Sequence, residues 1–238
     1  MRVRGKVTKK SRSTGSAGTI SSPEVHINDR RLIRDLNAVS RIGIGSHGSV
    51  TRLVFSVQDL RSRQLFIHLM NQAGLKVRMD QIGNVFGRLE GRRAKEPAVM
   101  VGSHLDTVVQ GGKFDGAVGV VGALEAVRTL KENRVFLASP VEVVCFVGEE
   151  SSRFGFSTLG SSLMTGEIGL EDLAHAVDQD GTKLGDVLSG MGVHRKNLAS
   201  LRRNPASLKA YLELHIEQGP ILEAKKKRIG VVTSIAAP

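Results

Sequence analysis

Two hydrophobic periodicities alternate along the chain and predict the order of its secondary structure. After Asn28 and again after Ser56, apolar side chains recur every three or four residues, which predicts two helices, the second ending at Gly74. Gly116–Leu130 has the same spacing and many small residues, so we expect a third helix that lies close to a sheet. A helical, loop-rich region should follow over residues 159–201.

Short apolar segments lie between and after these helices and predict strands. They are 75–79, 85–89, 98–101, Val141–Val147, Tyr211–Ile216 and Ile229–Ile235. The runs at 98–101 and Val141–Val147 are continuously apolar, as is typical of strands buried on both faces of a parallel sheet. Strands that alternate with helices indicate an α/β fold with a mainly parallel sheet flanked by helices. The last segment is strand-like up to Pro238, so we expect the fold to be incomplete at the C-terminus.

Composition restricts the class of protein. The chain has 238 residues, of which 40% are hydrophobic and 24% charged, as in soluble globular proteins. No run approaches the roughly 20 apolar residues of a membrane span, so we expect no membrane partner. The single cysteine, Cys145, cannot form an internal disulfide, which suits a cytoplasmic location. Because Cys145 lies in an apolar strand, we interpret it as an inert packing residue.

The net charge of +11 is concentrated in two short segments. The first 23 residues contain six basic and no acidic side chains, and Lys225–Arg228 contains four basic ones, so the remainder is nearly neutral. We expect residues 1–22 to be a disordered basic tail and Lys225–Arg228 a solvated turn. With only 4% aromatic residues, this pattern argues against a specific nucleic-acid partner.

Polar residues follow the first continuous apolar run. His104 and Asp106 come directly after it, and in an extended chain residues two apart point the same way. The Asp106 carboxylate could then hold the His104 imidazole in one tautomer, as the outer partners of metal-binding histidines do. Asp115 stands at the start of the small-residue helix, where it is either an N-cap or a rigidly held metal ligand.

A second polar group, Glu149 and Glu150, follows the strand Val141–Val147. Adjacent carboxylates after a buried strand are costly unless a cation receives them, although a solvated loop is an equal alternative. Their side chains diverge, so that one can bind metal while the other acts as a general base. The carboxyl ends of parallel strands share one edge, which is where sites form in such sheets.

His215 lies between Leu214 and Ile216 in a predicted strand, where a histidine alone is more often a packing residue than a ligand. The other polar groups favour the interpretation of His215 as a ligand, because all of these residues follow a strand or lie at its end. We therefore expect His104, Asp115, Glu150 and His215 to meet at one sheet edge. Imidazole and carboxylate ligands suit zinc and similar metals.

At these motifs the sequence resembles the zinc-dependent amidohydrolases of the peptidase M20 superfamily. More narrowly it resembles the hydantoinase/carbamoylase branch, which includes N-carbamoyl-L-amino-acid hydrolases, allantoate amidohydrolases and β-ureidopropionases. The resemblance rests on GSHLDTVVQGGKFDGAVGV (102–120), VGEESSRFGFSTLGS (147–161) and ELHIEQGPILE (213–223). Weaker similarity lies at VTRLVFS (50–56) and IGNVFGRL (82–89), and the likeness extends from about residue 27 to the C-terminus.

The resemblance implies a zinc-peptidase-like catalytic domain and a role for each candidate. His104, Asp115 and His215 would bind one metal ion, with Asp106 orienting His104. Asp115 would bridge to a second ion that Glu150 also binds, Glu149 would be the general base, and Gln218 would contact substrate. The ions would be zinc, manganese or cobalt. A histidine at 215 follows the carbamoylase pattern, which favours linear amides and ureido compounds over peptides.

The chain departs from this family in length. Members continue with a lid or dimerisation domain and then a further catalytic segment that supplies the last metal-binding histidine. We therefore interpret 23–228 as the N-terminal part of a catalytic domain and 229–238 as the start of the lid segment. We expect this chain alone to bind at most one metal ion well, to show little or no turnover without complementation, and to lack the family's homodimer contact.

Two alternative functions remain open at this point. One is an M20-type aminopeptidase, which shares the metal-binding residues but acts on peptides. The other is a non-catalytic fragment that keeps the fold only, and metal content after gentle purification would separate it from an enzyme.

Overall fold

A computed structural model describes residues 25–194 and 198–235. The basic tail expected at residues 1–22 lies outside the described residues. Five strands form one sheet: β1 (Lys76–Met79), β2 (Val85–Leu89), β3 (Ala98–His104), β4 (Val141–Phe146) and β5 (Leu208–Leu212). The longer helices are α1 (Asp29–Ser40), α2 (Val57–Gln72) and α3 (Ala117–Glu132). Shorter helical elements are η1 (Ser46–Gly48), α4 (Leu159–Thr165), α5 (Leu170–Leu173), α6 (Leu184–Gly190), α7 (Leu198–Leu201), η3 (Pro205–Ser207) and α8 (Ile221–Ala224).

The strand order β1-β2-β4-β3-β5 brings the ends of three parallel strands to one edge. β3 pairs parallel with both β4 and β5, while β2 is antiparallel to both of its neighbours, β1 and β4. All strands except β2 therefore run in the same direction, which confirms the expected mainly parallel α/β fold. In the β3–β4 register His104 lies opposite Phe146, so both strands end at the same level.

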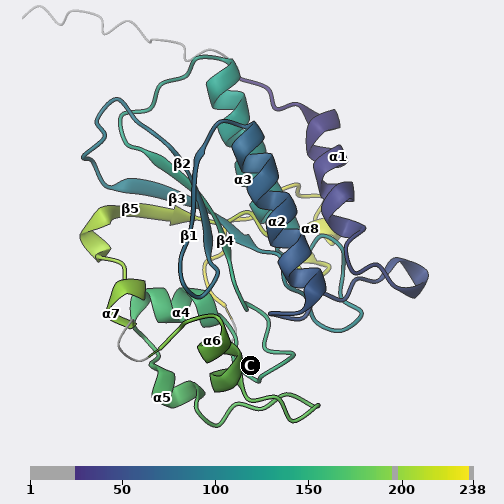
Figure 1. Cartoon of the computed structure of the whole chain (residues 1–238). Coiled ribbons are helices and arrows are strands. Elements are labelled where there is room, and N and C mark those ends of the chain that lie inside the picture. The colour runs from purple at the N-terminus through teal and green to yellow at the C-terminus, as the bar shows by residue number, and fades with distance from the viewer. Residues whose placement is uncertain (1–24, 195–197, 236–238) are drawn as a thin grey trace, which may run out of the picture.

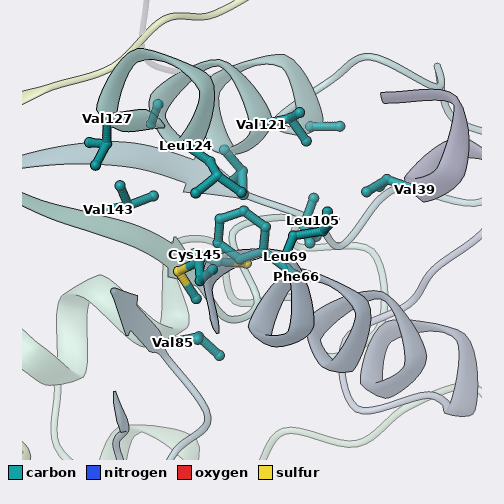
Figure 2. Close-up of a cluster of buried hydrophobic side chains, with 14 of the residues drawn as sticks. Val39, Phe66, Leu69, Val85, Leu105, Val121, Leu124, Val127, Val143 and Cys145 are labelled. Carbon is teal, nitrogen blue, oxygen red and sulfur yellow. The ribbon is translucent and has the colours of Figure 1, made fainter. Parts of the chain in front are cut away.

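The alternation of side chains along β4 explains how the sheet is covered. Val141, Val143 and Cys145 belong to the main hydrophobic cluster, which the helices α1, α2 and α3 complete. Figure 1 shows α2 and α3 crossing this face of the sheet, and Figure 2 shows Val143 and Cys145 among the side chains of the helices. On the opposite face Val144 packs in a smaller cluster.

Local signals set the helix starts where the sequence predicts them. The Asn28 side chain accepts a hydrogen bond from the backbone N–H of Arg31 at 3.0 Å, and α1 begins at the next residue. The Ser56 hydroxyl likewise accepts from the N–H of Asp59 and starts α2. α3 follows Gly116, as expected from its small residues.

A second hydrophobic cluster supports the region after β4. It joins α4, α5 and α6 to Val54, Ile82 and Val147, and Figure 1 shows these helices grouped beyond the strand ends. The cluster therefore braces the turn after β4, where Glu149 and Glu150 lie. Among the described residues, no helix is both long and apolar enough to cross a membrane.

Two strand predictions near the C-terminus are wrong. The predicted strand Tyr211–Ile216 is β5, which starts three residues earlier and ends at Leu212, because its pairing with β3 ends at Val101. The predicted strand Ile229–Ile235 is not a strand, and Val231 and Ile235 are 89% and 88% exposed. A β-branched sequence favours extended backbone, but a strand also needs a neighbour to pair with, and in the described part of the chain none lies beside this segment.

Candidate metal centre

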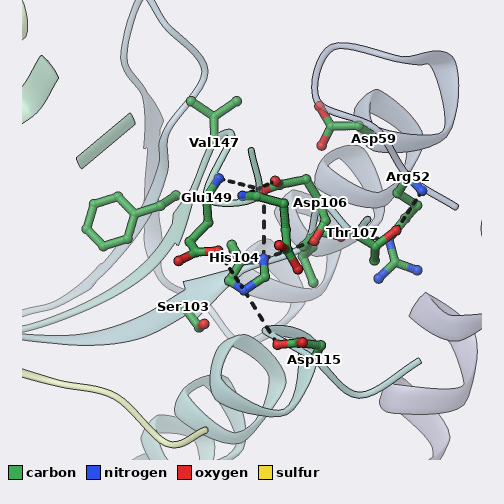
Figure 3. Close-up of polar contacts among 12 residues, drawn as sticks. Arg52, Asp59, Ser103, His104, Asp106, Thr107, Asp115, Val147 and Glu149 are labelled. Atoms are coloured by element: carbon green, nitrogen blue, oxygen red, sulfur yellow. Dashed lines mark hydrogen bonds and ion pairs between the residues drawn. The ribbon is translucent and has the colours of Figure 1, made fainter. Parts of the chain in front are cut away.

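The candidate residues lie where β3, β4 and β5 end. His104 is the last residue of β3, Asp115 precedes α3, and Glu149 and Glu150 follow β4 after a short turn. His215 lies three residues beyond β5. Figure 3 shows His104 between Glu149 on one side and Asp115 on the other. The parallel register of the three strands thus brings together segments that are more than 100 residues apart.

His104, Asp115 and His215 form one group of facing ligand atoms. Nε2 of His104 lies 3.8 Å from Oδ1 of Asp115, and Nε2 of His215 lies 3.1 Å from the same oxygen. The two imidazole rings are stacked with their centroids 6.3 Å apart. His104 is buried, while Asp115 and His215 are partly accessible at the side-chain level. The three residues predicted to share one metal ion therefore converge.

The hydrogen bonds of the two rings determine which nitrogen is free. Nδ1 of His104 lies 2.9 Å from the carbonyl oxygen of Asp106, and Nδ1 of His215 lies 2.9 Å from that of Ile216. Because a carbonyl oxygen only accepts, each Nδ1 carries the proton. When a ring is neutral, its Nε2 directs a lone pair toward the Asp115 carboxylate, as in histidines that bind a metal.

The two oxygens of Asp115 have different surroundings. Oδ2 accepts a hydrogen bond of 2.6 Å from Nε2 of Gln218. Oδ1 is buried and has no hydrogen-bond partner in the described structure, although the Nε2 atoms of His104 and His215 face it. A buried carboxylate oxygen without a hydrogen-bond partner is unfavourable by itself, and a cation between this oxygen and the two imidazole nitrogens would satisfy it. The residues present therefore fit a divalent metal ion.

Gln218, which the sequence predicts to contact substrate, contacts Asp115 in this structure. It has a positive φ of 54°, which is uncommon for a residue other than glycine. This conformation accompanies the hydrogen bond that fixes one Asp115 oxygen and leaves the other directed at the two histidines. A contact between Gln218 and substrate stays a prediction.

Asp106 connects the β3 end to the β4 end through its carboxylate. The carboxylate accepts hydrogen bonds from the backbone N–H groups of Glu149 and Glu150, at 3.2 and 2.9 Å, and lies 3.8 Å from Nδ1 of His104. The backbone carbonyl of Asp106 accepts the hydrogen bond from Nδ1 of His104. Orientation of His104 by the Asp106 carboxylate stays a prediction, since the carboxylate faces the ring at 3.8 Å and the hydrogen bond itself goes to the backbone carbonyl.

Glu149 and Glu150 form a second group of facing atoms together with His104. Oε2 of Glu149 lies 3.7 Å from Nε2 of His104, and the Glu149 side chain is 41% exposed. The structure thus groups Glu150 with His104 and Glu149, rather than with Asp115 as the resemblance implies. Burial, and then the neighbouring carboxylates, raise the pKa of both Glu149 and Glu150, whereas His104 acts to lower it.

The same crowding of carboxylates acts on His104. Burial alone would lower the pKa of His104, but the negative charges of Asp106 and Glu149 outweigh burial and raise it. The site therefore carries an excess of negative charge around a buried imidazole. This concentration of negative charge attracts a cation, which none of these residues would do as strongly alone.

A glycine permits the close approach of His104 to the start of α3. Gly116 has a φ of +60°, and a Cβ atom at this position would lie 2.6 Å from Nε2 of His104 and 2.5 Å from its carbonyl oxygen. Any larger residue would displace the ring from Asp115. The motif at residues 102–120 contains this glycine, which leaves space for the His104 ring.

Residues that the sequence reasoning missed join the β3 and β5 ends. Glu213 accepts hydrogen bonds from the hydroxyl of Ser103 and, at 2.7 Å, from that of Tyr211, which also donates to the carbonyl of Gly102. Ser103 adjoins His104, and Glu213 lies two residues before His215. The signal in the sequence is Glu213, a single acidic residue within an otherwise apolar run, which indicates that this carboxylate has a polar partner.

Comparison with known proteins gives the family. Residues 84–211 match the model of peptidase family M28. A ureidoglycolate hydrolase from Oryza sativa subsp. japonica is 40% identical over 95% of this chain, and an N-carbamoyl-L-amino acid amidohydrolase from Geobacillus stearothermophilus is 40% identical over 88%. The crystal structure of a hydantoinase/carbamoylase family amidase from Burkholderia ambifaria matches 85% of this chain with a TM-score of 0.75 and 40% identity.

These matches confirm the resemblance to hydantoinase/carbamoylase amidases, although the matching family model is numbered M28 where the sequence segments suggested M20. The chain spans about half the length of the relatives that it matches, with 48% of the Oryza protein, 51% of the Geobacillus protein and 48% of the Burkholderia chain covered.

Proposed function

Since the chain belongs to peptidase family M28, we propose that its sheet-edge site holds a divalent metal ion and serves the hydrolysis of non-peptide C–N bonds in linear amides or ureido compounds. The observation that carries this proposal is the buried Oδ1 atom of Asp115, which lacks a hydrogen-bond partner and is faced by Nε2 of His104 and His215. The names of the most similar relatives support the choice of bond.

The donor atoms support one well-formed ion site. His104, Asp115 and His215 would hold the ion as imidazole, carboxylate and imidazole ligands. The second group, with Glu149 and Glu150, requires the same Nε2 atom of His104, so both groups cannot be filled at once by these residues alone. We therefore propose one tightly bound ion for this chain and a second only where further ligands are supplied.

A bound divalent cation would polarise the substrate carbonyl and lower the pKa of water. Glu149 takes the role of general base, because its carboxylate is partly exposed and lies 3.7 Å from Nε2 of His104. Glu149 then returns the proton to the leaving nitrogen, while Asp106 holds the backbone of the Glu149–Glu150 turn in place.

The substrate class follows from the relatives and has two candidates. The relatives are named for ureidoglycolate and for N-carbamoyl-L-amino acids, and both compounds contain a ureido group. The peptidase name of the matching family favours a peptide as the second candidate. We favour the ureido group, since the full-chain similarity is to amidohydrolases. A cytoplasmic location and a homodimer of the whole protein belong to this proposal as well.

The metal part of the proposal is tested by titrating the metal-free chain with Zn²⁺ in a calorimeter. We expect one ion per chain for the wild type and none for His215→Ala, which removes the most accessible ligand. A control variant, His175→Ala, changes a histidine outside the site and should bind as the wild type does. Absence of Zn²⁺ binding by the folded wild-type chain would reject the proposed site.

The catalytic part is tested with the zinc-loaded chain at high concentration. Ammonia release is measured from N-carbamoyl-L-amino acids and ureidoglycolate, and amine release from a dipeptide. We expect slow hydrolysis of the ureido compounds only, abolished by Glu149→Gln, which should still bind zinc. Preference for the dipeptide would favour the peptidase candidate, and no turnover of any substrate would reject catalysis by this chain alone.

A further inference from the structure

Arg52 is completely buried and is tied to the loop that follows His104. Its side chain is 0% exposed, and Nε donates a hydrogen bond of 2.7 Å to the carbonyl oxygen of Leu105. The backbone of the same residue pairs with Thr107, since its N–H donates to Oγ1 at 2.9 Å and its carbonyl accepts from the Thr107 N–H at 3.0 Å. Three hydrogen bonds thus attach one arginine to residues 105–107, and Figure 3 shows Arg52 beside Thr107.

The other end of the guanidinium is anchored in the end of α1. Nη1 lies 3.3 Å from the carbonyl oxygen of Val39 and 3.2 Å from that of Ile42. Nη2 is buried and has no partner in the described structure. The guanidinium therefore bridges the carboxyl end of a helix, where carbonyl groups lack partners, to the peptide between His104 and Asp106.

A comparison with Arg63 shows that Arg52 is not merely a buried ion pair. Arg63 is also buried, and it donates to the carbonyl of Gly83 at 2.9 Å, but it pairs with the carboxylate of Asp59 at 2.7 Å. In the described structure the Arg52 side chain donates its hydrogen bonds to carbonyl oxygens, those of Leu105, Val39 and Ile42. Burying a charge without a carboxylate partner is costly, so a fold that keeps it gains something from the carbonyl contacts.

The loop that Arg52 holds controls both parts of the proposed site. The carbonyl of Asp106 fixes the His104 ring, and the carboxylate of Asp106 fixes the backbone of Glu149 and Glu150. We propose that Arg52 is a positioning residue, which sets the direction of the His104 Nε2 atom by fixing the Leu105 peptide. The inference rests on the proposed metal site. Lysine cannot replace Arg52, because one ammonium group lacks the planar fork that reaches carbonyls on opposite sides.

The experiment compares Arg52→Lys with the matched control Arg63→Lys, using Co²⁺ as the probe. The dissociation constant and the visible absorption spectrum of bound Co²⁺ are recorded for wild type and both variants, after circular dichroism has shown that each is folded. We expect Arg52→Lys to bind Co²⁺ roughly 10–100-fold more weakly with an altered spectrum, as when the outer partners of metal ligands are changed. Arg63→Lys should keep the wild-type constant and spectrum.

A second variant keeps the test decisive if Arg52→Lys does not fold. Thr107→Val removes the hydroxyl that accepts from the Arg52 N–H and should also weaken Co²⁺ binding and alter the spectrum. A folded Arg52→Lys or, failing that, Thr107→Val with wild-type affinity and spectrum would overturn the inference. Equal weakening by Arg63→Lys would overturn it too, since that result indicates general destabilisation. Failure of the wild type to bind Co²⁺ rejects the proposed function instead.

Discussion

Nε2 of His215 lies 3.1 Å from Oδ1 of Asp115, while Nδ1 of the same ring lies 2.9 Å from the carbonyl oxygen of Ile216. The same oxygen faces His104 at 3.8 Å. With a neutral imidazole this contact is repulsive, and a cation between the two atoms, either a proton or a metal ion, makes it favourable. The stability of the arrangement at the ends of β3 and β5 therefore depends on whether a cation lies between these side chains.

Asp115→Asn should separate the two states of this contact. An amide nitrogen in place of Oδ1 donates a hydrogen bond to an imidazole Nε2, so the metal-free variant should be at least as stable as the metal-free wild type. Its affinity for Zn²⁺ should fall by more than about 100-fold, since a ligand is lost rather than an outer partner. Thermal unfolding with and without Zn²⁺ measures both effects. Asp186→Asn, at an exposed position in α6, is the control, and an unchanged Zn²⁺-induced shift in Asp115→Asn would contradict the assignment.

Gly116→Ala should lower both stability and metal affinity. The positive φ of Gly116 costs a residue with a Cβ atom about 1–2 kcal/mol, and contact with His104 adds to this cost. Gly181→Ala is a matched control, because Gly181 also has a positive φ, of +81°, but a Cβ there meets no atom within 4 Å. Chemical denaturation and Zn²⁺ titration of both variants check the prediction. Equal Zn²⁺ affinity in the two variants would show that the contact with His104 has no effect on the site.

Asp59 should make stability depend on pH. Burial raises the pKa of Asp59 to about 6, and its ion pair with Arg63 opposes this shift only in part. Between the unfolded pKa near 4 and the folded value, the native state binds a proton that the unfolded chain has released, so its free energy of unfolding falls as pH rises. The stabilisation that Asp59 gives the native state is present below about pH 4 and lost above about pH 6. It amounts to about 3 kcal/mol, since each unit of pKa corresponds to about 1.36 kcal/mol.

The measurement is the free energy of unfolding of the wild type minus that of Asp59→Asn, followed from about pH 4 to about pH 7. Subtraction cancels the groups that titrate in both proteins. We expect the difference to decline as pH rises and then to level. A difference that increases with pH would mean that Arg63 dominates and that the pKa of Asp59 lies below its ordinary value.

Cys145 should be unreactive in the native protein. Its side chain is fully buried in β4, and burial raises the pKa of the thiol far above its ordinary value, so the thiolate is absent. Reaction with a colorimetric disulfide reagent at mildly alkaline pH should be negligible until guanidinium chloride is added, and should then reach one thiol per chain. Rapid modification without denaturant would indicate local opening of β4.

The sequence predicted the features that depend on short segments. The caps at Asn28 and Ser56, the small-residue helix after Gly116 and the apolar strands need only neighbouring residues to be recognised. The shared edge of the site could also be predicted, because parallel strands place their carboxyl ends together whatever the side chains are. His104 and Asp115 were found for this reason.

Contacts that depend on distant side chains could not be predicted in this way. Arg52 and Leu105 are joined across 53 residues, and Ser103 and Glu213 across 110 residues. Nothing in the spacing of either pair indicates that they meet, since each residue alone is compatible with an ordinary loop or strand. The end of β5 at Leu212 depends likewise on where its pairing with β3 stops. A sequence pattern reports on residues that are close along the chain, whereas these contacts are set by residues that are neighbours in space.

The position of β5 at the border of the sheet has a consequence for handling the protein. β5 pairs with β3 on one side, and in the described part of the chain no strand covers its other side. Tyr211 and Leu212 are exposed there, which leaves a row of unused amide and carbonyl groups beside apolar surface. Such borders recruit extended segments of other molecules into aggregates, and a single positive charge, Lys209, is what opposes this within the strand. Replacement of Lys209 by valine should therefore lower the concentration at which the purified chain precipitates.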